Sequence, residues 1–258
     1  MKYLKEKDFI LSRISCAIEN YCNKDGFITE QKGAYDLVTD IDKGIEDFLK
    51  KEIYKEFPED NIISEETLPF SEINGRTWII DPIDGTCNMA HGIKFYGVQC
   101  ALIEGEDIVL SAIVLPAFGE EYYAIKDGGA YLNGKRISVS SKTSVQNSIV
   151  SFGDYSHKSS KHAILQHKAI GWLYPQIAKI RMFGAACFDF TFLASGKTDS
   201  TVIMTKNLWD ICPGVLLCKE AGAIVTDFDG KDYKAGVFGV AASSNENLHN
   251  LTLASLKE

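Results

Sequence analysis

The stretch "WIIDPIDGTCNMAHG", residues 78–92, carries the strongest signal in the chain for both fold and function. An apolar run typical of a buried strand leads into Asp81, and Asp84 follows three residues later, across a proline. Asp-Pro and Asp-Gly are common turn dipeptides, so a simple turn is the plainest interpretation. However, carboxylates are rarely placed beside a core without a partner, and no basic residue is near these two in sequence. We therefore expect this turn to hold a cation.

The residues between and after the two aspartates suit that task. Pro82 fixes φ and has no N–H, which leaves the Ile83 carbonyl free to point inward between the carboxylates. Gly85 permits close approach of the backbone to a ligand. If Thr86–Ala90 opens a helix, its free N–H groups can accept an anion such as phosphate. One loop can thus hold metal ions and the phosphate that they activate.

Further acidic residues lie at the ends of other predicted elements. Each alone has an ordinary explanation, as a helix cap or a solvated loop. Together they form an oxygen-only set without His or Cys, which suits Mg²⁺ rather than zinc. Two Mg²⁺ would cancel the four negative charges of Glu65, Asp81, Asp84 and Asp210, so that an acidic protein can bind an anionic substrate. The set comprises Asp36, Asp40, Asp42, Glu65, Glu66 and Asp210, besides Asp81 and Asp84.

Hydrophobic periodicity predicts helices at both ends of the chain and strands in its middle. We expect helices over 3–22, from Thr39 or Asp40 to before Pro58, 162–177, 185–195, 210–221 and 246–256. We expect strands over 61–64, 77–80, 95–103, 108–115, 121–125, 148–152, 198–204, 223–226 and 237–243. This order predicts a layered α/β sandwich: one domain, residues 1–258, made of two packed lobes of roughly 1–145 and 146–258.

Composition excludes several classes of protein. The net charge is −8 and there is no Lys/Arg block, which argues against a nucleic-acid surface. The apolar runs are far shorter than the ~20 residues of a membrane span, and "MKYLKEKDF" is too charged for a secretory signal. Seven cysteines without a Cys-x-x-Cys pair predict reduced, buried thiols. We expect a cytoplasmic protein with no membrane or nucleic-acid partner.

The ordered motifs of this chain resemble those of the inositol monophosphatase family of Mg²⁺-dependent, lithium-sensitive phosphatases. The resemblance spans nearly the whole chain, and "DPIDGT" followed downstream by "WD" is its most specific part. The matching pieces are "DLVTDID" (36–42), "IISEE" (62–66), "WIIDPIDGTCNMAHG" (78–92), "GAACFDFTFLASGKTD" (184–199) and "WDICPGVLLCKEAGAIVTDFDG" (209–230). The resemblance implies an αβαβα sandwich, one phosphatase domain and a homodimer.

The resemblance also implies a role for each matched residue. Two or three Mg²⁺ would be bound by Glu65, Asp81, the Ile83 carbonyl, Asp84 and Asp210. Asp42 and Thr86 would align and deprotonate the attacking water, with Glu66 supporting a further, water-held ion. The N–H groups of Gly85 and Thr86 would hold the phosphate. Substrate contacts would come from Asp84, Gly184, Ala186, Ile203 and Asp210.

Two positions near the substrate depart from the family pattern, Ile203 and the neighbouring Lys206. Inositol-specific members have a glutamate seven residues before the "WD" aspartate, and here that position is Ile203. The leading hypothesis is hydrolysis of inositol 1-phosphate or a similar small phosphate. The alternative substrates are NADP(H), 3′-phosphoadenosine 5′-phosphate, histidinol phosphate and fructose 1,6-bisphosphate. Two other classes are a regulatory binding protein on this fold and a non-catalytic Ca²⁺ store.

Overall fold

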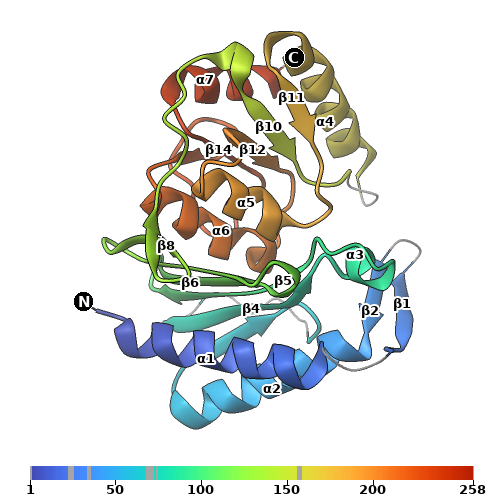
Figure 1. Cartoon of the computed structure of the whole chain (residues 1–258), viewed down its shortest axis with the longest axis vertical. Coiled ribbons are helices and arrows are strands. Elements are labelled where there is room, and N and C mark those ends of the chain that lie inside the picture. The colour runs from blue at the N-terminus through green and yellow to red at the C-terminus, as the bar shows by residue number, and fades with distance from the viewer. Residues whose placement is uncertain are drawn as a thin grey trace.

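The protein is a sandwich of alternating helix and sheet layers (Figure 1). The computed structural model describes residues 2–22, 26–33, 36–67, 73, 75–155 and 159–257. The helices are α1 (Leu4–Tyr21), α2 (Asp40–Glu56), α3 (Thr86–Ala90), α4 (Ser160–Leu173), α5 (Ala186–Ala194), α6 (Leu208–Glu220) and α7 (Glu246–Ser255), with 3₁₀ turns η1 (Pro116–Phe118), η2 (Val145–Asn147) and η3 (Tyr174–Gln176). The strands are β1 (Thr29–Gly33), β2 (Asp36–Thr39), β3 (Asn61–Ser64), β4 (Arg76–Asp84), β5 (Gly97–Glu104), β6 (Asp107–Leu115), β7 (Glu120–Ile125), β8 (Gly129–Leu132), β9 (Lys135–Ile137), β10 (Ile149–Phe152), β11 (Lys179–Arg181), β12 (Ser200–Ile203), β13 (Ile224–Thr226) and β14 (Val240–Ser243).

The first sheet has seven strands in the order β3-β4-β5-β6-β7-β8-β9. Only β3 and β4 run parallel; the other neighbours are antiparallel. Helices α1 and α2 cover one face, where Ile14, Ile45 and Leu49 pack against Trp78. Their apolar residues recur at helical spacing, so each helix buries one stripe and exposes the rest.

Helices α5 and α6 form the middle layer, between the two sheets (Figure 1). All residues of α6 from Leu208 to Cys218 are buried except Asp210. A helix that is apolar on every side is one that other elements surround. The first turn of α5 points its N–H groups toward Asp84 at the end of β4.

The second sheet has five strands in the order β11-β10-β12-β14-β13. Helices α4 and α7 cover its outer face, with Phe152, Leu173 and Leu248 in the core between them. The fold predicted from the sequence, a layered αβαβα sandwich, is therefore confirmed. No helix in the described part of the chain is both long and apolar enough to cross a membrane.

Several local predictions were wrong. The expected strand end at Ile80 is not an end, because β4 continues through Pro82 to Asp84. The register shifts between Asp81 and Asp84, as expected where a proline cannot donate to the ladder. Residues 36–39 form strand β2, which was not predicted, and they pair with β1, which was not predicted either.

Candidate metal and phosphate site

The acidic residues predicted as metal ligands converge at one edge of the first sheet. Strands β3 and β4 run parallel with Ser64 opposite Ile80, so Glu65, directly after the end of β3, lies beside Asp81 of β4. Asp81 is 1% exposed, and its pKa is raised well above the usual range by burial and then by Glu65, Asp84 and Asp210. Burial and the nearby Asp210 raise the pKa of Glu65 to about 8. These carboxylates are therefore close enough to repel one another.

Asp84 is bound by the first turn of α5. The Ala186 N–H donates to its Oδ1 at 3.2 Å, and the Cys187 N–H donates to its Oδ2. These bonds and the positive end of the helix favour the ionised carboxylate, but burial prevails and raises its pKa. The predicted metal ligand and the predicted substrate contact Ala186 are thus in direct contact.

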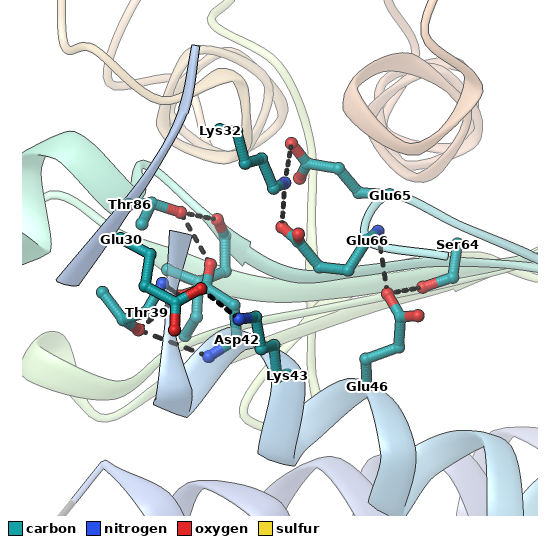
Figure 2. A network of polar contacts seen from close by, with 11 residues as sticks. Glu30, Lys32, Thr39, Asp42, Lys43, Glu46, Ser64, Glu65, Glu66 and Thr86 are labelled. Atoms are coloured by element: carbon teal, nitrogen blue, oxygen red, sulfur yellow. Dashed lines mark hydrogen bonds and ion pairs between the residues drawn. The ribbon is translucent and has the colours of Figure 1, made fainter. Parts of the chain in front are cut away.

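Asp42 and Thr86, the predicted water-activating residues, lie side by side (Figure 2). Thr86 Oγ1 is 2.8 Å from both Asp42 Oδ1 and the Ile83 carbonyl oxygen. Asp42 completes a capping box at the start of α2, where the Thr39 N–H donates to its Oδ2 at 2.9 Å. Burial raises the pKa of Asp42, although its bonds from Thr39 and Thr86 oppose this. A base held in this way is oriented and poorly solvated.

Glu66 and Glu65 both face Lys32 of β1 (Figure 2). The Lys32 Nζ is 3.6 Å from Glu65 Oε1 and forms a closer ion pair with Glu66. On the opposite side, buried Glu46 of α2 accepts from the Glu66 N–H at 2.9 Å. Lys32 was not among the predicted site residues, because β1 was not predicted.

The predicted substrate residues line a single pocket of about 190 Å³. Ile203 lies at the end of β12, only 4% exposed, and packs beneath Gly153. Asp154, which was not predicted, follows β10 and also lines the pocket. The signal that could have identified it is the Gly-Asp pair directly after a predicted strand. The lining residues are Asp84, Gly153, Asp154, Gly184, Ala185, Ala186, Ile203, Met204, Thr205 and Asp210.

Gly85 joins β4 to α3 with a backbone that few other residues adopt. Its φ is +92°, and a Cβ there would lie 2.7 Å from the Phe95 carbonyl oxygen and 2.9 Å from Ala185 Cβ. We expected Gly85 to let the backbone approach a ligand closely. It also lets the backbone approach Phe95 and Ala185 closely. It brings the start of α3 against the start of α5.

Asp40, another acidic residue of the 36–42 segment, makes a backbone contact instead of joining this cluster. Asp40 Oδ1 accepts from the Ile28 N–H at 2.8 Å, which ties the hairpin of β1 and β2 to α2. Asp36 lies in β2, and its side chain is outside the described part of the structure.

The donor set fits a hard divalent cation. Every candidate ligand is an oxygen, the donor type that Mg²⁺ prefers. Asp81 Oδ1 is buried and has no hydrogen-bond partner, which a cation would supply. Among the described residues, no three acidic, His or Cys side chains are already gathered as tightly as bound-metal ligands. Like charges without a counterion repel one another and stand apart in this way.

Comparisons with known proteins agree with these motifs over the whole chain. A model of the inositol monophosphatase family matches residues 10–258. The chain is 36% identical over 208 residues to a Thermotoga maritima protein named fructose-1,6-bisphosphatase/inositol-1-monophosphatase, covering 81% of this chain and 78% of the relative. It is 31% identical over 245 residues to Nus factor SuhB of Escherichia coli K12, covering 93% and 90%. The solved structure of Thermotoga maritima IMPase has a TM-score of 0.85 at 31% identity, covering 98% of this chain and 97% of that one.

Proposed function

The chain belongs to the inositol monophosphatase family and is a phosphoric monoester hydrolase; on this premise we propose that it hydrolyses inositol 1-phosphate or a similar small phosphate with Mg²⁺. The observation that carries the proposal is the cluster of buried carboxylates around Asp81 Oδ1, beside the paired Asp42 and Thr86. Divalent-metal dependence is a property of the family.

The metal ions would be held by oxygen atoms alone. Bound Mg²⁺ supplies positive charge against the phosphate oxygens and a lowered pKa for a coordinated water. The proposed ligands, for two or three ions, are Glu65, Asp81, the Ile83 carbonyl, Asp84 and Asp210. Glu66 supports a further ion through water.

Asp42 and Thr86 move the proton in this proposal. A water molecule placed against Thr86 Oγ1 gives its proton to that hydroxyl, which passes its own proton to Asp42 Oδ1 at 2.8 Å. Burial makes Asp42 a stronger base than an exposed aspartate, because its pKa is raised. The N–H groups of Gly85 and Thr86 hold the phosphate in line for attack, and phosphoryl transfer requires little beyond this positioning.

The pocket beside the site selects the leaving group. Besides the proposed metal ligands Asp84 and Asp210, its described lining carries the carboxylate of Asp154 and no basic side chain. Carboxylates accept hydrogen bonds from hydroxyl groups and repel a second phosphate. We therefore favour a polyol monophosphate over NADP(H), 3′-phosphoadenosine 5′-phosphate and fructose 1,6-bisphosphate.

Fructose 1,6-bisphosphate is the second candidate substrate, and it rests on the name of the Thermotoga maritima relative. A panel of phosphate esters with Mg²⁺ separates the two. It contains inositol 1-phosphate, fructose 1,6-bisphosphate, histidinol phosphate, NADP and 3′-phosphoadenosine 5′-phosphate. We expect the highest kcat/KM for inositol 1-phosphate. A rate for it below a hundredth of the nucleotide rates refutes the assignment, and no turnover of any ester refutes the activity itself.

A binding role is the candidate from another class, and it rests on the relative named Nus factor SuhB. The Asp84→Asn variant distinguishes this role from catalysis, because it removes charge from the site and keeps the shape of the side chain. If a cellular function persists while hydrolysis is lost, binding carries that function. If both are lost together, catalysis does.

A further inference from the structure

Gln99 is a fully buried amide in the middle of the apolar strand β5. It lies directly opposite Asp81 in the antiparallel register of β4 and β5. The same face of β5 carries Ala101 and Ile103, which pack toward α6. Burying an amide costs free energy unless it is hydrogen-bonded. The presence of a glutamine in this apolar strand is therefore explained by the groups to which it hydrogen-bonds.

Its partners are the two aspartates of "DPID". Gln99 Nε2 is 3.3 Å from Asp81 Oδ2 and 3.3 Å from Asp84 Oδ2. Ionised carboxylates only accept hydrogen bonds, which requires the NH₂ group of the amide to face them. One amide thus bridges two like charges that repel each other.

This contact distinguishes the two oxygen atoms of Asp81. Oδ2 is occupied by Gln99, whereas Oδ1 is buried and has no hydrogen-bond partner. Asp84 is held at three points, by Gln99 and by the N–H groups of Ala186 and Cys187. The bridge therefore fixes the spacing of the two carboxylates and leaves a defined oxygen of Asp81 to face the cation.

We infer that Gln99 is a positioning residue for the metal site, which orients Asp81 and Asp84 so that Asp81 Oδ1 points to the metal. The inference rests on the proposed function. Residues that orient metal ligands typically contribute about 10- to 100-fold to metal affinity. Gln99 acts through the aspartates and touches neither the phosphate nor the attacking water.

Two substitutions test this role. Gln99→Met keeps the length of the side chain and removes the donor, while Gln99→Asn keeps the amide one methylene too short to bridge. The matched control is Cys100→Ala, because Cys100 is the next residue of β5 and packs on the opposite face, in the core with Trp78 and Ile80. The control perturbs the same strand without touching the aspartates.

The first measurement is Mg²⁺ binding to the substrate-free protein by isothermal titration calorimetry. We expect both Gln99 variants to raise the Mg²⁺ Kd by about 10- to 100-fold, and Cys100→Ala to lower the melting temperature with an unchanged Kd. In assays, the Gln99 variants need more Mg²⁺ for half-maximal rate, and kcat returns close to the wild-type value at saturating Mg²⁺. A purely structural role would lower the active fraction and leave the half-saturating Mg²⁺ concentration unchanged.

An unchanged Mg²⁺ Kd in Gln99→Met overturns the inference. If that variant does not fold, as judged by circular dichroism, the Kd of Gln99→Asn decides in its place. Loss of folding in both variants also overturns the inference, because the role that it assigns is local. A wild-type protein that binds no Mg²⁺ and hydrolyses no phosphate ester would instead refute the proposed function.

Discussion

At the scale of the residue, the site concentrates buried negative charge on Asp81. Burial and three neighbouring carboxylates raise its pKa, and its Oδ1 has no hydrogen-bond partner. An acid whose folded pKa is raised adds stability that is fully present below its unfolded pKa and is lost as the pH rises. Without metal, the ionised site therefore opposes folding near neutral pH.

Asp81→Asn keeps the shape of the side chain and removes its charge. We expect turnover with Mg²⁺ to fall by about 10³-fold or more, the scale of losing a strong electrostatic contact in an active site. The metal-free variant should melt no lower than wild type at pH 8, because no buried charge has to form. Steady-state kinetics and thermal unfolding without metal measure the two effects. A near-normal rate would exclude Asp81 from the site.

Asp154 lines the pocket that we propose for the leaving group. Because it is exposed, we expect Asp154→Ala to raise the KM for inositol 1-phosphate by only about tenfold, near the lower limit for a hydrogen bond to a charged group. Hydrolysis of p-nitrophenyl phosphate, which has no hydroxyl groups to bind, should stay unchanged. Asp229→Ala is the control, since Asp229 is an exposed aspartate that does not line this pocket. Equal losses on both substrates would contradict the assigned role.

At the scale of the element, the junction of β4 and α3 depends on Gly85. Gly85 and Gly222 have nearly equal φ angles, +92° and +93°. A Cβ would meet neighbouring atoms at Gly85 and none within 4 Å at Gly222. Both Gly→Ala substitutions should lose about 1–2 kcal/mol of stability from the left-handed backbone. Gly85→Ala should lose more, and most of the activity as well, because the Cβ would displace α3 from α5.

Urea unfolding and kcat of the two glycine variants measure this difference. Equal loss of stability in both, with activity retained in both, would show that the crowding at Gly85 has no consequence.

The sequence predicts well those elements whose pattern reflects their own burial. Thr39, one of the two residues predicted as the cap of α2, caps that helix, and the amphipathic α1 begins and ends within a residue of its prediction. Prediction from the sequence fails where pairing between segments determines whether a strand forms. Strand β1 is polar, and it is a strand because it pairs with β2; without it, Lys32 cannot be placed near Glu65.

The residues of the candidate site also fall into two groups, those that the sequence predicts and those that it does not. Acidic residues at strand and helix ends are visible in the sequence because carboxylates beside apolar runs are rare. The sequence alone does not identify Gln99 or Asp154 as site residues, because their roles depend on residues distant in sequence. Gln99 contacts Asp81 and Asp84. Asp154 lines a pocket together with Gly184.

At the scale of the whole molecule, a buried polar network binds the second sheet to α7. His249 Nε2 is 3.0 Å from Thr226 Oγ1, and its Nδ1 is 3.2 Å from Ser243 Oγ. Burial lowers the pKa of His249, so its contribution to stability is present above the unfolded pKa and is lost as the pH falls through the lowered one.

His249→Gln tests this pH dependence. At pH 8 we expect the variant to be less stable by about 1–2 kcal/mol, the scale of the lost hydrogen bonds. At pH 5 the difference in stability should shrink. Either keeping the buried imidazole of the wild type neutral or ionising it then costs free energy. Urea unfolding at both pH values measures the change, and a constant difference would count against the network.

The homodimer and the division into lobes of roughly 1–145 and 146–258 stay predictions. Sedimentation equilibrium should give twice the chain mass of 28.6 kDa. Limited proteolysis should cut first near residue 145 if the lobes are separate units. A monomer mass would remove the homodimer.

The bond between Asp84 and α5 joins groups 102 and 103 residues apart in the chain. During synthesis on a ribosome, most of the acidic cluster therefore emerges long before the amides that bind Asp84, and before Asp210. At that stage the nascent protein carries negative charge whose partners have not yet been made, and a chain shorter than 210 residues lacks Asp210, one of the proposed metal ligands. We therefore expect fragments that end before Asp210 to hydrolyse no phosphate esters.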